Sequence, residues 1–325
     1  MNKTEWILKS WRLGKSASLV LFASILFFCV TSCLEAQNPP WDPPVFEAVP
    51  AGRCLKLSVE SIPISSTGNA AALGEALSDR IALTFKKTEP KLILLSVSAP
   101  ITTRTDAIVQ AVSARFAQAV VLGISADVNF THRLDNDQPI VSAWVVGGGD
   151  LKLSVVLADP DLESFDSDSS YAQYVHESLL RTTRDKSLLL FSAFPAQKTN
   201  RIVRELSALE GSRVPLVVLA ASGNQPTIYF AGRRCRNALA AVTLSGSAAV
   251  DVVPVSDLQA KALADKKLIL EEAGLACEAA IVCPPKSCDC NAFKKSIQKH
   301  IGKLTPVLGL SANDSGQAIL FSTPR

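Results

Sequence analysis

The stretch that decides the fold runs from residue 55 to residue 97, LKLSVESIPISSTGNAAALGEALSDRIALTFKKTEPKLILLSV. Its first ten residues alternate between apolar and polar side chains, which is typical of a β-strand. The segment Asn69–Phe85 then predicts a helix, because four apolar side chains recur at a spacing of four: Leu73, Leu77, Ile81 and Phe85. Lys91–Val97 is an aliphatic run and indicates a buried strand. The stretch therefore predicts a strand–helix–strand unit.

The pattern continues toward the C-terminus. Thr103–Phe116 predicts a second helix, and Ala119–Ser125 predicts another buried strand. Ile140–Val146 and Leu151–Leu157 predict two strands, joined by Gly147-Gly-Gly-Asp150 as a hairpin turn, since glycine tolerates positive φ. We therefore expect a first α/β module over residues 54–160.

A second module is expected over residues 213–325, after a connecting helix–strand–helix segment at residues 161–212. The connecting elements are expected at Tyr171–Thr183, Ser187–Phe194 and Gln197–Leu209. Those of the second module are strands at Val214–Ala220, Ala249–Val255 and Ala279–Cys283, helices at Ala231–Leu244, Ser256–Ala273 and Asn291–Ile301, and a closing hairpin of Leu304–Leu310 with Gln317–Ser322. The same element order then occurs twice, which predicts an internal duplication. The expected fold class is α/β (α+β-like), with two tandem modules, each a mixed sheet with helices.

The N-terminus has the layout of a secretory signal. Basic side chains come first (Lys3, Lys9, Arg12 and Lys15), followed by an uncharged, largely apolar run from Ser16 to Leu34. The run includes Val30-Thr-Ser-Cys33, which resembles the lipobox of bacterial lipoproteins. That resemblance implies removal of residues 1–32, acylation of Cys33 and anchoring in a lipid bilayer. An uncleaved membrane anchor and ordinary cleavage near Ala36 are the alternatives.

Residues 33–53 are expected to form a tether to the folded part, because prolines stiffen this segment. Leu34 follows the cysteine, where enterobacterial lipoproteins retained in the inner membrane favour aspartate. We therefore expect the periplasmic side of the outer membrane more than the inner membrane.

The composition indicates a folded chain, with 48% hydrophobic and 19% charged residues. A formal net charge of +3 is too small to indicate a nucleic-acid partner. No glycine-rich phosphate loop opens a helix, so no nucleotide is expected.

Six cysteines remain after Cys29 in the signal and Cys33 are set aside: Cys54, Cys235, Cys277, Cys283, Cys288 and Cys290. An even number in an exported chain favours disulfides, although the sequence does not fix their connectivity. Free or intermolecular thiols and a zinc site are the alternatives, and the last four lack paired Cys-x-x-Cys spacing.

No other catalytic or metal constellation is expected. His132, His176 and His300 form no zinc motif. The acidic residues Asp159, Asp161, Glu163, Asp166 and Asp168 lack the EF-hand glycine and are interpreted as a solvated loop. The basic side chains Lys294, Lys295, Lys299, His300 and Lys303 fit the polar face of a helix, with an anionic lipid or glycan as the alternative partner. No cofactor and no catalytic residue are expected.

Part of the chain resembles the α/β domain of TolB-type periplasmic proteins, which is shared by the lipoprotein CsgG and by lipoproteins that activate penicillin-binding proteins. The resemblance rests on Gly74–Leu83, Lys91–Ser96 and Ala119–Gly123. Such domains bind partner proteins or assemble, and they supply no catalytic residues.

The expected function is therefore a non-enzymatic envelope lipoprotein that binds or assembles with envelope proteins. A periplasmic enzyme or thiol-redox protein that uses the C-terminal cysteines is one alternative. A structural or surface lipoprotein is the other.

Overall fold

The structure is a computed structural model. It describes residues 55–63, 69–98, 102–126, 129–131, 140–211, 214–223, 225–246, 249–254, 275–283, 307–310 and 317–324, together with Glu272 and Lys295. All of them lie in one compact unit, Val49–Arg325. The predicted signal, Cys33 and most of the predicted tether fall in the other unit, Met1–Ala48, and lie outside the described residues.

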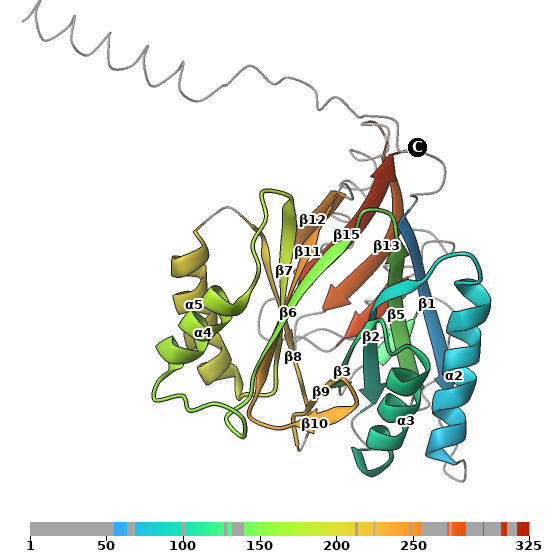
Figure 1. The fold of residues 1–325 in the computed structure, drawn as a ribbon, viewed down its shortest axis with the longest axis horizontal. Helices are drawn as coiled ribbons and strands as arrows, with labels where there is room; N and C mark the ends of the chain where they lie inside the picture. Colours follow the sequence, from blue (N-terminus) through green and yellow to red (C-terminus); the bar gives the residue numbers. More distant parts are fainter. Residues whose placement is uncertain are drawn as a thin grey trace, which may run out of the picture. The chain divides into compact units, whose positions relative to one another are not determined.

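Residues 55–148 supply four strands of the first sheet (Figure 1). Its elements are β1 (Leu55–Pro63), α2 (Ala70–Thr84), β2 (Pro90–Ser98), α3 (Thr102–Arg115), β3 (Val120–Ala126) and β5 (Ile140–Gly148). The strand order is β1-β5-β2-β3, with β5 antiparallel to both neighbours and β2 parallel to β3. Helix α2 begins where the Asn69 side chain accepts a hydrogen bond from the Ala71 amide at 3.0 Å.

The second sheet repeats this arrangement with residues 152–245. Its elements are β6 (Lys152–Ala158), α4 (Asp168–Ser178), β7 (Asp185–Ser192), α5 (Ala196–Glu210), β8 (Leu216–Ala220) and β11 (Leu239–Ser245). The order is β6-β11-β7-β8, with β11 antiparallel to β6 and β7, and with β7 parallel to β8. A capping box between Ser167 and Ser170 starts α4.

The third sheet has the same strand order. It contains β12 (Ala249–Pro254), β13 (Leu275–Cys283), β14 (Val307–Leu310) and β15 (Gln317–Pro324) in the order β12-β15-β13-β14. Strand β15 is antiparallel to β12 and β13, whereas β13 and β14 are parallel. The predicted helices at Ser256–Ala273 and Asn291–Ile301 lie outside the described residues, apart from Glu272 and Lys295.

The sheets therefore show a strand order that occurs three times. The expected duplication is wrong in its number of copies and in its boundaries, because the segment expected as a connector, 161–212, supplies α4, β7 and α5 of the second copy. In addition, short strands from one copy pair with a strand of another copy. Strand β4 (Asn129–Thr131) pairs with β14, and β9 (Ile228–Phe230), which pairs with β10 (Arg233–Cys235), also pairs with β3. The predicted module boundaries thus do not separate the sheets.

The predicted helix at Ala231–Leu244 is wrong, since the chain forms β10 and β11 there. Ala231 and Asn237 have φ of 49° and 52°, which interrupts any helix at both positions. All seven residues of β11 are buried. A strand buried on both faces is a continuous apolar run, which periodicity alone does not distinguish from a helix.

Both predicted hairpins are also wrong in their pairing. Strands β5 and β6 belong to different sheets, and β14 and β15 are not neighbours in the third sheet. The glycine turn does have the expected positive φ, 75° at Gly148 and 58° at Gly149. It carries the chain to the next sheet, however, instead of back along the same one.

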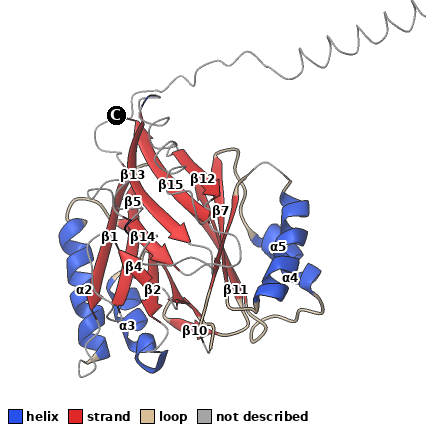
Figure 2. Cartoon of the chain, turned by 180° about the vertical axis from the view of Figure 1, so that it is seen from behind, coloured by secondary structure: helices blue, strands red, loops and turns tan. Residues whose placement is uncertain are grey.

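The core of the described residues lies between the sheets and between the first two sheets and their helices. One cluster combines side chains of all three sheets, including Trp144, Phe191 and Ile281. A second cluster lies beneath α2 and α3, and a third beneath α4 and α5. Figure 2 shows the two helix pairs on opposite sides of the strands. The mixed α/β fold class predicted from the sequence is confirmed.

Candidate functional site

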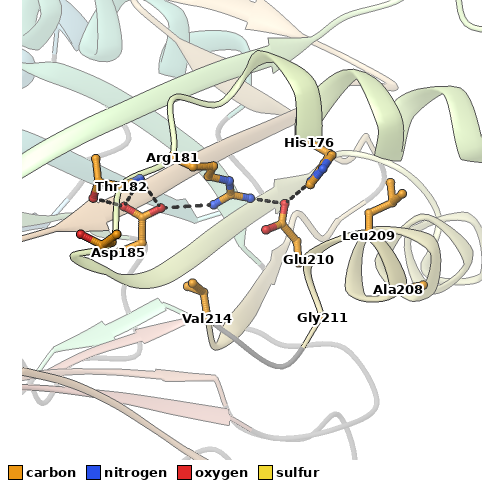
Figure 3. A pocket seen from close by; sticks show the side chains of 10 residues that line it. His176, Arg181, Thr182, Asp185, Ala208, Leu209, Glu210, Gly211 and Val214 are labelled. Atoms are coloured by element: carbon orange, nitrogen blue, oxygen red, sulfur yellow. Dashed lines mark hydrogen bonds and ion pairs between the residues drawn. The ribbon is translucent and has the colours of Figure 1, made fainter.

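The candidate site is a cleft at the C-terminal ends of α4 and α5, where the chain enters β7 and β8 (Figure 3). Its volume is about 800 Å³. It is lined by His176, Arg181, Thr182, Thr183, Asp185, Ala208, Leu209, Glu210, Gly211 and Val214. The repeated strand–helix order creates this cleft, because both helices lie on the same face of the second sheet and their C-terminal ends lie at the same edge.

A charged network lies across the cleft. Arg181 donates to Glu210 and lies 3.8 Å from Asp185, measured from Nη1 to Oδ2. The Nδ1 atom of His176 lies 2.9 Å from Oε1 of Glu210 (Figure 3). One guanidinium therefore bridges two carboxylates that come from the end of α5 and the start of β7.

Asp185 is held in place by several hydrogen bonds. Its carboxylate accepts hydrogen bonds from the Thr182 amide at 3.2 Å, from the Thr182 hydroxyl at 2.7 Å and from the Ser245 hydroxyl at 2.6 Å. Burial alone would raise the pKa of this carboxyl. The hydrogen bonds from Ser245 and Thr182 and the charge of Arg181 outweigh burial, so the pKa lies below its ordinary value.

Asp185→Asn is expected to flatten the acid dependence of stability. Because the folded-state pKa is depressed, the ionised carboxylate stabilises the fold fully above its ordinary pKa of about 3.9. That contribution is lost as the pH falls through the folded-state value. Urea unfolding of the variant and the wild type between neutral and acid pH measures the difference. Asp166→Asn, at an exposed position before α4, is the control; a wild-type acid slope in Asp185→Asn would contradict the assignment.

A second cluster surrounds Cys235, which is a free thiol and 1% exposed. Asp159 is fully buried beside it, and Arg233 lies 3.3 Å from that carboxylate. Burial, and then the charge of Asp159 and a hydrogen bond to it, raise the pKa of the Cys235 thiol to about 12. Cys235, one of the six disulfide candidates, forms no disulfide in the structure.

We expect Cys235 to resist alkylation in the folded protein, because the thiolate is the reactive form and both burial and the raised pKa suppress it. Iodoacetamide at mildly alkaline pH, followed by peptide mapping, measures this. Modification is expected only after denaturant is added. Rapid modification of Cys235 without denaturant would contradict the described environment.

The other candidate residues are distributed as follows. Cys277 and Cys283 lie on β13, and Cys54, Cys288, Cys290, His132 and His300 lie outside the described residues. Of the acidic run, Asp159 is buried, and Asp168 pairs with Arg201 at 2.5 Å. Lys295 is exposed, and it is the one described member of the basic set on the last predicted helix.

The contacts among His176, Arg181, Asp185 and Glu210 join residues that are scattered along the sequence. They come from two helices, a loop and a strand start, and no short motif links them. Within the described part of the chain, no group of three or more His, Cys, Asp or Glu side chains is placed to hold a metal ion. None of the described helices is long and apolar enough to span a membrane.

Comparisons with known proteins found similarities to this chain in structure and in sequence. Among solved structures, it is similar to cyanuric acid hydrolase from A. caulinodans, with 11% identity, 83% of this chain and 99% of that chain covered, and a TM-score of 0.44. It is also similar to thiamine monophosphate kinase from Aquifex aeolicus, with 12% identity, coverage of 92% and 88%, and a TM-score of 0.24. No curated protein matches.

The model of the FIST N domain matches residues 91–261, which is more than half of the chain and extends from β2 past β12. The resemblance to TolB-type domains finds no support in the comparisons. The chain therefore belongs to the FIST family, through a FIST N domain at residues 91–261.

Proposed function

We propose that this FIST-family chain is a lipid-anchored, non-enzymatic binding protein of the cell envelope, which takes a small polar ligand in the Arg181–Glu210 cleft. The FIST N domain is of a sensory type, and a sensor requires a site of this kind. The observation that carries the proposal is the charged network across a cleft of about 800 Å³. Small-molecule sites commonly have volumes of about 300–1,000 Å³ and a few fixed polar groups.

The network suits recognition of a polar ligand. Arg181 and His176 supply cationic or neutral N–H donors, while Thr182 and Thr183 add hydroxyl groups at the lining. Both hydrogen bonds described for Glu210 go to Oε1, which leaves Oε2 to the cleft. A ligand carrying a carboxylate would compete with Glu210 for Arg181, and a ligand carrying an amine would bind Glu210.

We propose a non-enzymatic function because the environments of Asp185 and Cys235 make both side chains unreactive. Asp185 accepts three kinds of hydrogen bond and has a lowered pKa, so it is a poor general base. Cys235 has a pKa raised to about 12, so it is a poor nucleophile or redox thiol. The envelope part rests on the resemblance of residues 30–33 to a lipobox, and we retain the predicted envelope protein partner and the outer membrane as the preferred location.

The experiment is a thermal-shift screen of the purified full chain against panels of small mono- and dicarboxylates and of small primary amines. A ligand present at about one hundred times its Kd stabilises the fold by about 2.7 kcal/mol. We expect stabilisation by members of one panel, and we expect it to weaken in His176→Gln.

The matched control is Arg184→Met, whose side chain is exposed and does not line the cleft. It is expected to retain the wild-type response. No response to either panel, or an equal response in His176→Gln and Arg184→Met, would overturn the cleft as the binding site.

A further inference from the structure

Four large apolar side chains are strongly exposed among the described residues: Leu180 (78%), Leu83 (63%), Leu162 (56%) and Leu209 (46%). Three of them lie at the C-terminal ends of helices. Leu83 is in the last turn of α2, Leu180 follows the end of α4, and Leu209 is in the last turn of α5. Only Leu162 lies elsewhere, after β6.

Figure 1 shows these three helix ends directed toward the same end of the compact unit, α2 on one side of the strands and α4 and α5 on the other. Side-chain contacts hold the adjoining strand starts of the two sheets together. The Lys91 ammonium donates to the Leu151 carbonyl at 2.8 Å, which joins the start of β2 to the start of β6. Arg184 pairs with Asp150 at 3.4 Å, which joins the loop before β7 to the same turn.

The first described residue of the fold lies at this same end. Leu55, the first residue of β1, is in register with Gly148, which precedes the Gly149–Asp150 turn. Residues 34–54 connect Leu55 to the predicted lipid site and span at most about 75 Å when extended. An anchored chain thus holds this end near the bilayer at a high effective concentration, so a surface with weak affinity suffices.

The charge at this end complements an anionic surface. We counted exposed charged side chains in the last helical turns, in the loops that follow them and at the start of β6. The cations are Lys86, Lys87, Arg115, Lys152 and Arg184, and the acids are Glu89 and Glu177. The acidic run from Asp159 to Asp168 follows β6, at the opposite end of that strand.

We infer that the tether-side surface (Leu83, Lys86, Lys87, Leu180, Arg184 and Leu209) docks onto the headgroup region of an anionic lipid bilayer. The leucines insert at the level where headgroups meet acyl chains, and the basic side chains pair with lipid phosphates. The inference rests on the proposed anchor at Cys33. It adds an orientation, in which the C-terminal ends of α2, α4 and α5 face the membrane.

The test uses the full chain, acylated in cells and reconstituted into vesicles of phosphatidylethanolamine with a minority of phosphatidylglycerol. Vesicle flotation first measures anchoring. Two variants, Leu180→Trp and Leu162→Trp, then add an indole at an exposed position at each end. Fluorescence, corrected for the parent chain, is compared between vesicles with ordinary and with dibrominated acyl chains.

We expect the brominated chains to lower the added signal of Leu180→Trp about twofold and to leave that of Leu162→Trp unchanged. Flotation of the parent chain without selective quenching of Leu180→Trp would overturn the docking surface and leave the anchor intact. Failure of the parent chain to float would overturn both the anchor and the docking.

Discussion

Gly147→Ala is expected to destabilise the fold by about 3 kcal/mol or more, because the added methyl group has no space and forces the surrounding structure to shift. A Cβ at this position would lie 2.2 Å from the carbonyl oxygen of Glu89 and 3.0 Å from the Cα of Pro90. Both are backbone atoms at the irregular pairing of β2 with β5, so no flexible side chain is available to yield. Urea denaturation followed by circular dichroism measures the loss.

The matched control is Gly211→Ala at the end of α5. A Cβ there meets nothing within 4 Å, but φ is +65°, so only the backbone preference of glycine is lost. We expect a cost of about 1–2 kcal/mol, the penalty of a Cβ in the left-handed region. Equal stability losses in the two variants would show that the close approach at Gly147 relaxes freely, contrary to the packing described here.

Arg181→Met is expected to cost about 3 kcal/mol, since it leaves two largely buried carboxylates without their shared cation. The side chains of Asp185 and Glu210 are only 3% and 10% exposed. Methionine retains much of the apolar stem of arginine. The loss of stability therefore comes from the missing positive charge more than from a change in side-chain volume. Chemical denaturation near neutral pH is the appropriate measurement.

Arg184→Met is the comparison for this prediction, because its ion pair with Asp150 is 74% and 30% exposed. Such a surface pair contributes about 0–1 kcal/mol. Adding Glu210→Gln to Arg181→Met is expected to recover part of the stability. A cost for Arg181→Met no larger than that for Arg184→Met would mean that the bridge does not hold the cleft together.

The sequence predicts the elements of the first copy well, because their apolar periods are regular and their ends are marked. Helix α2 was expected at Asn69–Phe85 and is Ala70–Thr84, with Asn69 as its cap. Strand β2 was expected at Lys91–Val97 and is Pro90–Ser98. Local patterns of this kind depend on side chains close together in the chain.

The pairing of strands could not be predicted in the same way. The Gly147–Asp150 turn has the composition of a hairpin, yet β5 inserts between β1 and β2 while β6 begins another sheet. Strand β11 is so evenly buried that its sequence resembles a helix as much as a strand. Pairing with strands far away in the sequence determines both the sheet to which β6 belongs and the strand conformation of β11. Local sequence patterns do not contain this information.

The candidate site was missed for the same reason. His176 and Glu210 are 34 residues apart, and Asp185 meets Ser245 across 60 residues. Only the repeated strand–helix order, which stacks the ends of α4 and α5, brings them together. Recognition of residues 152–245 as a copy of that order would have indicated that the ends of α4 and α5 converge.

We propose that this FIST-family chain works from a lipid anchor at Cys33. Metabolic labelling with an alkyne palmitate analogue, in bacterial cells that express the wild type, Cys33→Ala or Cys29→Ala, tests it most directly. We expect equal labelling of the wild type and Cys29→Ala, and none of Cys33→Ala. Labelling of Cys33→Ala at the wild-type level would contradict the account.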